Sequence, residues 1–178
     1  MQTTQTVHQA RWNEIVNDPS LRDLPYKVET NERGQLILSP HTAKHSVRQK
    51  RVLRYLDECL SGNGYEQGEA YPEYPIATPR GVKQADAIWA SRKREREMNE
   101  TGDPPTLAPE ICVEVMSPAN SMAEMDEKRA LYLEAGAEEV WIVEEDGTVR
   151  FFTNEELDAS RLAPDVPSTL PGSGSGSS

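Results

Sequence analysis

The sequence has few cysteines, few aromatic residues and no long hydrophobic run. It contains 2 cysteines, and 6% of its 178 residues are aromatic. No run of about 18 apolar residues is present, so no segment is expected to span a membrane. The stretch from Met1 to Thr6 lacks the basic and apolar regions of a secretory signal. We therefore expect a cytoplasmic protein.

The two cysteines, Cys59 and Cys112, lie within apolar patterns that predict buried, reduced thiols rather than a disulfide. Neither has a second cysteine or a histidine at the spacing of a zinc ligand set, which argues against a zinc site. With 36% hydrophobic residues, a chain of this length can bury a core without such covalent or metal support.

Charge is distributed unevenly along the chain. The formal net charge of −11 argues against a nucleic acid as partner. Residues 1–99 nevertheless carry 15 Lys and Arg against 13 Asp and Glu, whereas residues 100–178 carry 4 against 17. The basic residues cluster at 44–54 and 80–96, so one face of an acidic protein could still be positive. Solvated surface charges are the alternative interpretation.

The periodicity predicts one α/β domain over residues 1–153, built around a mixed sheet. Helices are expected at 7–17, 42–60 and 121–135, the last beginning with a capping box of Ser121 and Glu124. Strands are expected at 26–29, 35–38, 65–76, 82–90, 111–116, 139–144 and 149–153. Residues 91–106 are predicted to be a long loop, with a helical turn within it as the alternative. Residues 154–178 are predicted to be a polar tail that is linker-like at 172–178.

Charged and polar side chains lie at positions where these elements should face a core. Glu114 and Asp86 lie within apolar strands, Lys128 lies in the apolar stripe of its helix, and the stripe of the helix at 42–60 ends in His45 and Gln49. An unpaired buried carboxylate costs several kcal/mol, so each acid needs a cation, hydrogen-bond donors or a cleft. Two carboxylates suit Mg²⁺ or Mn²⁺. A buried ion pair with Lys128 is the alternative, and Lys128 could also extend to the surface along its aliphatic stem.

Several spaced motifs together resemble the Uma-two family of bacterial restriction endonucleases. The resemblance is carried by the stretch from Pro109 to Pro118, by Lys128, Tyr132 and Gly136, and by the apolar strand 140–143. Further matches near the N-terminus are Trp12, Glu29, Gly34, Ser39, Pro40 and His45. This family belongs to the PD-(D/E)XK nuclease superfamily. The resemblance therefore implies a restriction-endonuclease-like αβββαβ core, the element order predicted above, with an additional N-terminal helix and β-hairpin.

The resemblance also implies metal ligands. Asp86 matches the first metal-binding acid and Glu114 the acid of the (D/E)XK strand, together holding Mg²⁺ or Mn²⁺. The superfamily pattern has a proline where this sequence has Ala85, and a lysine where it has Met116. Lys128 on the following helix is the implied substitute for that lysine.

The remaining implied roles concern the pocket and the substrate. His45, Gln49 and Glu29 are expected to complete the pocket by positioning metal-bound water or phosphate. The residues expected to contact a nucleic acid backbone are Lys44, Arg48, Arg51, Lys83 and Arg92.

The resemblance thus implies a metal-dependent endonuclease that hydrolyses DNA phosphodiester bonds. A different class of function is a catalytically silent nuclease-fold protein that binds or scaffolds, with a homodimer as one form. Hydrolysis of another phosphoester is a third interpretation, because a fold does not fix a substrate.

Overall fold

The computed structural model describes residues 6–60 and 67–171. The helices in these ranges are α1 (Val7–Val16), α2 (Ala43–Leu60), α3 (Arg92–Glu100) and α4 (Met122–Glu134). A two-stranded hairpin is formed by β1 (Tyr26–Thr30) and β2 (Leu36–Pro40). The main sheet contains β3 (Gly68–Thr78), β4 (Gly81–Ser91), β5 (Ile111–Val115), β6 (Glu139–Val143), β7 (Val149–Phe152) and β8 (Glu156–Leu157).

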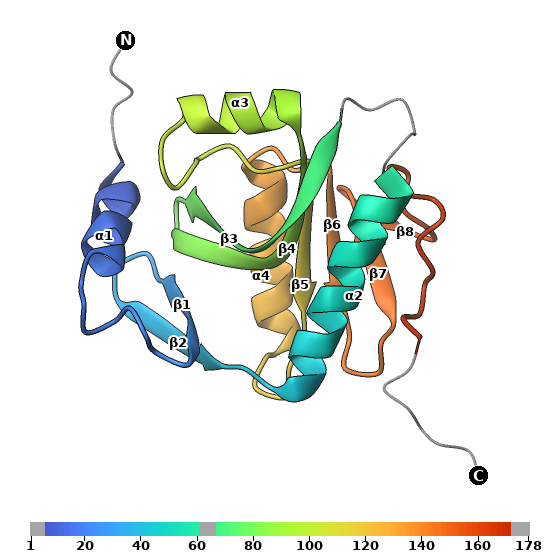
Figure 1. Ribbon diagram of the computed structural model, residues 1–178, viewed down its shortest axis with the longest axis horizontal. Coiled ribbons are helices and arrows are strands. Elements are labelled where there is room, and N and C mark those ends of the chain that lie inside the picture. Colours follow the sequence, from blue (N-terminus) through green and yellow to red (C-terminus); the bar gives the residue numbers. More distant parts are fainter. Residues whose placement is uncertain (1–5, 61–66, 172–178) are drawn as a thin grey trace.

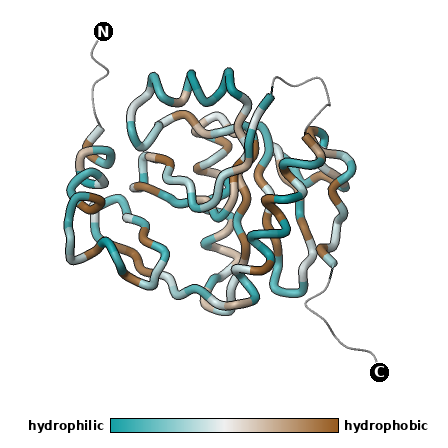
Figure 2. The backbone as a smooth tube through the Cα atoms, viewed as in Figure 1, coloured by the Kyte–Doolittle hydropathy of each residue, from teal (hydrophilic) through white to brown (hydrophobic). Residues whose placement is uncertain are grey.

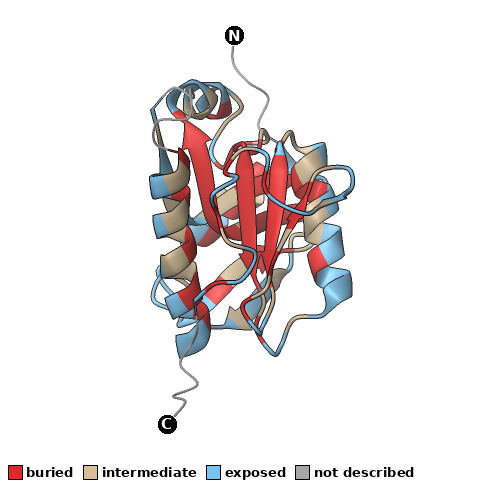
Figure 3. Cartoon of the chain, turned by 90° about the vertical axis from the view of Figure 1, so that its right-hand side faces the viewer, coloured by how far each residue is buried: buried red, intermediate tan, exposed pale blue. Residues whose placement is uncertain are grey.

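The main sheet is mixed, and its strands lie side by side in the order of the chain. Neighbouring strands are antiparallel except β5 and β6, which are parallel because α4 connects them as a crossover. Helix α2 covers one face of the sheet and α4 the other (Figures 1 and 3). The order α2-β3-β4-β5-α4-β6 confirms the predicted αβββαβ core, with α3 inserted between β4 and β5.

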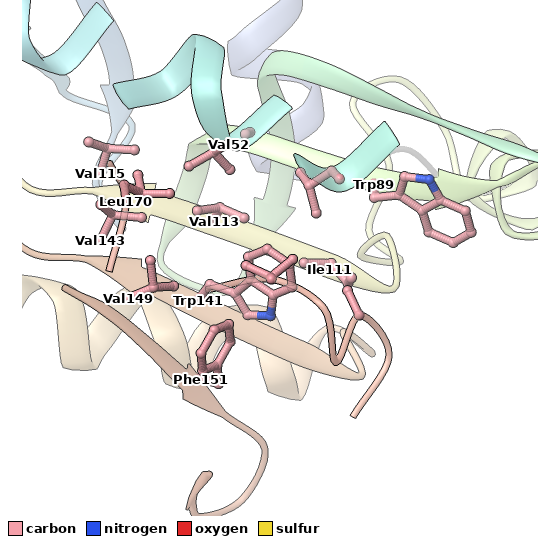
Figure 4. Packing of buried hydrophobic residues seen from close by; sticks show 14 of the residues in the cluster. Val52, Trp89, Ile111, Val113, Val115, Trp141, Val143, Val149, Phe151 and Leu170 are labelled. Carbon is pink, nitrogen blue, oxygen red and sulfur yellow. The ribbon is translucent and has the colours of Figure 1, made fainter. Parts of the chain in front are cut away.

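Strand β5 separates two apolar layers and is buried along its whole length. Ile111, Val113 and Val115 point to the cluster beneath α2, where side chains of α2 and of the central strands interlock (Figure 4). Cys112 belongs to the cluster on the α4 side, and strand alternation places Glu114 on that same side. A charged group therefore lies in the layer between the sheet and α4.

The β1–β2 hairpin docks on β4 through side chains that bond to backbone groups. Thr30 Oγ1 accepts a hydrogen bond from the Val82 amide at 2.8 Å, and Glu29 Oε2 accepts one from the Gln84 amide at 2.7 Å. Gly81 has a φ of +101°, and a Cβ atom there would meet the carbonyl oxygen of Thr30. The close approach of β1 to β4 thus requires glycine at this turn.

Residues 91–106 contain a helix where the sequence predicts a loop. Ser91 caps α3 by accepting a hydrogen bond from the Arg94 amide at 3.1 Å. Met98 is the buried residue of this helix, and the rest is largely hydrophilic (Figure 2). Because Met98 is the one apolar residue among the nine residues of α3, the segment has no repeating apolar pattern that would predict a helix.

The segment after residue 153 packs on the domain as far as Leu170, beyond the boundary that the sequence predicts. Ala163, Val166 and Leu170 are buried in the cluster beneath α2. The buried Glu139 carboxylate accepts hydrogen bonds from Ser160 Oγ and the Arg161 amide, both at 2.7 Å. The linker predicted at 172–178 lies outside the described residues.

Cys112 is a fully buried free thiol, and Cys59 is partly buried. Across the ranges that the structure covers, no helix is both long enough and apolar enough to cross a membrane.

Candidate active site

The two predicted acids lie opposite each other on neighbouring strands. The β4–β5 ladder ends at the pair Ala87–Val113, and the next position along the same register pairs Asp86 with Glu114. Each is 1% exposed. The strands separate here, and Asp86 Oδ2 accepts a hydrogen bond from the Val115 amide at 2.7 Å in place of a ladder bond. Like charges at opposite positions repel, so this arrangement needs a cation.

That cation is supplied by Lys27, a residue that the sequence analysis missed. Its Nζ lies 3.0 Å from Asp86 Oδ1 and 3.1 Å from Glu114 Oε2, and the residue is 8% exposed. Burial alone would lower the pKa of Lys27, but the charges of Glu114 and Asp86 raise it well above its ordinary value. Lys27 is therefore a charged ammonium bridging the two acids.

Helix α4 brings two further groups to Glu114. Lys128 Nζ lies 2.8 Å from Glu29 Oε1 and 3.6 Å from Glu114 Oε2, and its side chain is 12% exposed. The buried Tyr132, one turn later, donates a hydrogen bond to Glu114 Oε1 at 2.6 Å. Lys128 thus points inward, as the helical stripe predicts.

The carboxylates differ in how easily they ionise. Burial raises the pKa of Glu114 to about 7, although Lys128 and Lys27 work in the opposite direction. Burial acts against the charged form of Asp86 too, but Lys27 and His45 lower its pKa well below the ordinary value. The pKa of Glu29 is also lowered, because Lys27 and Lys128 outweigh its burial. Three carboxylates here face two ammonium groups.

His45 and Gln49 reach the site from α2, as predicted. His45 Nε2 lies 3.3 Å from Asp86 Oδ2, and Gln49 Nε2 donates a hydrogen bond to the Asp86 carbonyl oxygen at 2.7 Å. His45 Nδ1 is buried and has no hydrogen-bond partner within residues 6–60 and 67–171. The structure therefore brings all six predicted catalytic and supporting residues to one place.

Two cavities flank this cluster. One, of about 370 Å³, is lined by Glu29 and Lys128 together with residues 37–40 of β2. The other, of about 440 Å³, is lined by His45 with Lys44 and Arg48. Asp86 and Glu114 are not among the residues that line these two cavities, so the two acids lie behind the side chains that do.

The predicted backbone-contact residues do not form one surface. Lys44 and Arg48 share the cavity beside His45. Lys83 is buried, and its Nζ donates a hydrogen bond to the Thr30 carbonyl oxygen at 2.9 Å. Arg51 donates a hydrogen bond to the Pro171 carbonyl oxygen. Arg92 is exposed at the start of α3, six residues beyond Asp86.

Asp86 and Glu114 are the donors that this site offers to a divalent ion. Among the described residues no three His, Cys, Asp or Glu side chains converge as a ready metal cluster. Two hard carboxylate oxygens nevertheless face one position, and the Lys27 ammonium stands there as a cation. Asp86 and Glu114 therefore fit Mg²⁺ or Mn²⁺ as a two-carboxylate site completed by water or substrate oxygens.

The chain resembles known proteins in sequence and in fold. The family model described as "Uma2: Putative restriction endonuclease" matches residues 19–172. A crystal structure described as a putative nuclease belonging to DUF820, from Anabaena variabilis, matches with a TM-score of 0.61 at 15% identity. The match covers 80% of this chain and 86% of that one. A comparison with curated proteins finds no match.

Proposed function

The chain belongs to the Uma2 family of putative restriction endonucleases, and from this premise we propose that it hydrolyses DNA phosphodiester bonds with a divalent ion held by Asp86 and Glu114. The observation that carries the proposal is the meeting of these two acids, on adjacent strands, with the ammonium of Lys128. Buried carboxylates at opposite strand positions cost stability, and a binding role explains why the fold keeps them.

The bound ion, Lys128 and Tyr132 would have different roles around the substrate phosphate. Mg²⁺ or Mn²⁺, when bound, supplies polarisation of the phosphodiester and a lowered pKa of bound water. Lys128 lies between Glu29 and Glu114, where its charge can stabilise negative charge that develops on the phosphate. Tyr132 holds Glu114 Oε1 and leaves Oε2 facing the cation position.

Three groups keep this arrangement rigid. Glu29 positions Lys128 and is itself held by the Gln84 amide. His45 bonds one oxygen of Asp86, and Gln49 bonds the Asp86 backbone. Such support matters because mutation of residues that hold the ligands of a metal site typically lowers metal affinity or activity by about 10–100-fold.

A plasmid nicking assay tests the proposal. Purified protein is incubated with supercoiled DNA and Mg²⁺ or Mn²⁺, beside the variants Asp86→Asn and Glu114→Gln. We expect nicking by the wild type and a loss of roughly a hundredfold or more in each variant, since both would be direct ligands. Asp126→Asn on the exposed side of α4 is the matched control and should retain activity. Absence of nicking by the wild type, or equal nicking by all four proteins, contradicts the proposal.

A second candidate function is a catalytically silent nuclease-fold protein that binds or scaffolds. The observation that favours it is the Lys27 ammonium, which already bridges both acids without a metal. Calorimetry distinguishes the two candidates. No binding of Mn²⁺ to the wild type, together with no nicking, favours the silent protein.

A further inference from the structure

Lys27 is the buried group of this site for which the proposed hydrolysis requires no role. It extends from β1 beneath the hairpin, and both of its ion pairs are made to the two acids proposed as metal ligands. Its partners are Asp86 Oδ1 and Glu114 Oε2, the oxygens that face each other across the β4–β5 register.

An ammonium and a divalent ion cannot share this position. A divalent ion bound to the same two oxygens at about 2.0–2.6 Å would lie where Lys27 Nζ now sits, at 3.0 and 3.1 Å from them. Two cations that close would repel each other strongly in a buried site. Occupancy by one therefore excludes the other.

The charges of the cluster favour exchange of one cation for the other. When all three acids are ionised, as metal binding requires, Asp86, Glu114 and Glu29 carry three negative charges, and Lys27 and Lys128 supply two positive ones. If a divalent ion replaces the Lys27 ammonium, it and Lys128 together balance the three carboxylates. Removal of an uncompensated buried charge is favourable.

Lys27 is buried in this structure, but a residue on the same face of its strand lines a cavity. Its side chain is on the same face of β1 as Glu29, since alternate residues of a strand point the same way. Glu29 lines the cavity of about 370 Å³ that opens beside the hairpin. A four-carbon stem lets an ammonium reach solvent from a partly apolar site.

We propose that Lys27 is an exchangeable internal cation, which occupies the position between Asp86 and Glu114 in the metal-free protein and is displaced when a divalent ion binds. This inference rests on the proposed function, because it takes these acids as the metal ligands. Lys27 would then lower the affinity of the site for a divalent ion. Its side chain would move away each time the ion binds.

Calorimetric titration with Mn²⁺ tests the competition directly. Lys27→Met removes the competitor, so we expect Mn²⁺ to bind this variant about tenfold or more tightly than the wild type, a difference of ~1.4 kcal/mol or more. Lys27→Arg keeps the charge and should bind no more tightly than the wild type. Lys83→Met is the matched control, since Lys83 is a neighbouring buried lysine that bonds a backbone carbonyl. We expect the affinity of the Lys83→Met variant for Mn²⁺ to stay within about twofold of the wild-type value.

A second measurement uses the unmodified protein and holds even if Lys27→Met does not fold. Brief acetylation followed by mass spectrometry reports how accessible each lysine is. We expect Lys27 to be protected without metal and to become several-fold more reactive when Mn²⁺ is added, whereas Lys83 stays unchanged. Equal Mn²⁺ affinity of wild type and Lys27→Met, or Lys27 that stays protected at saturating Mn²⁺, overturns the inference.

Failure of this inference can be told apart from failure of the proposed function. If Lys27→Met gains Mn²⁺ affinity but no form of the protein nicks DNA, the exchange is real and the nuclease proposal is wrong. If the wild type nicks DNA and loses activity in Asp86→Asn, while Lys27→Met binds Mn²⁺ no better, the nuclease stands and the exchange is wrong.

Discussion

Glu114 is a buried acid whose proton is retained to an unusually high pH. Its pKa is raised from 4.5 to about 7, chiefly by burial. Between these values the native state holds a proton that the unfolded chain has released, so this residue lowers stability as the pH rises from 4.5 through 7. The penalty is complete above about pH 7 and absent below about pH 4.5.

Replacement of Glu114 by Gln should therefore change how stability depends on pH. From about pH 5 to about pH 8, the metal-free variant should gain up to about 3 kcal/mol relative to the wild type. Urea unfolding at several pH values, with a chelator present, measures this gain. Glu124→Gln on the surface of α4 should show no such trend. A constant difference between wild type and Glu114→Gln would contradict the account.

Single residues also show what the sequence could and could not predict about the site. Asp86, Glu114 and Lys128 were predictable because a charge within an apolar strand or stripe breaks a regular pattern. Lys27 breaks no pattern. It alternates with Val28 in a hairpin, and alternation fits a strand with one solvated face equally well. The signal available was that Lys27 and Glu29 share a face, but only the docking of the hairpin on β4 decides whether that face is buried.

Among the elements, β6 holds the C-terminal segment through one side chain. The Glu139 carboxylate accepts hydrogen bonds from Trp141 Nε1, Ser160 Oγ and the amides of Arg161 and Leu162. A carboxylate can accept all of these, whereas an amide side chain offers one oxygen and adds donors of its own.

Glu139→Gln should therefore loosen residues 154–171 and lower the free energy of unfolding by about 2–4 kcal/mol. Urea unfolding measures the loss, and limited proteolysis should show earlier cleavage after residue 153. The exposed Glu155→Gln serves as the control and should match the wild type in both measurements. An unchanged cleavage pattern in Glu139→Gln would show that the segment is held in another way.

The elements that the sequence missed are those held by scattered contacts. The core helices and strands have regular apolar spacing, and their predicted order agrees with the structure. Helix α3 buries Met98 as its one core residue, and the C-terminal segment reaches the core through Ala163, Val166 and Leu170. Isolated apolar residues have no period, so their burial depends on tertiary packing that local patterns do not contain.

At the scale of the whole molecule, basic residues near the site must overcome a net charge of −11 if DNA is to bind. Lys44 and Arg48 line the cavity beside His45, next to the acidic Glu145 and Asp146. Arg92 begins α3 directly after Ser91, the last residue of β4, which lies about 16 Å along the strand from Asp86 because each strand residue advances about 3.3 Å. We therefore expect Lys44 and Arg48, which lie beside His45, to contact DNA, and Arg92, which lies far from the acids, not to contact it.

The double variant Lys44→Ala/Arg48→Ala should bind a short DNA duplex roughly tenfold more weakly than the wild type. Each lost phosphate contact should also reduce the slope of log affinity against log salt concentration by about one unit. Fluorescence anisotropy over a range of NaCl concentrations, with a chelator to prevent cleavage, measures both effects. Arg92→Ala/Lys93→Ala removes the same charge at the exposed start of α3 and should bind like the wild type. Equal weakening by both double variants would contradict this assignment.

The most direct measurement of the central claim is anomalous X-ray scattering from crystals soaked in Mn²⁺. The account predicts one strong peak between Asp86 and Glu114, about 2.0–2.6 Å from an oxygen of each, with the Lys27 side chain moved away. A crystal saturated with Mn²⁺ whose peaks all lie elsewhere, with Lys27 still bridging the two acids, would contradict it.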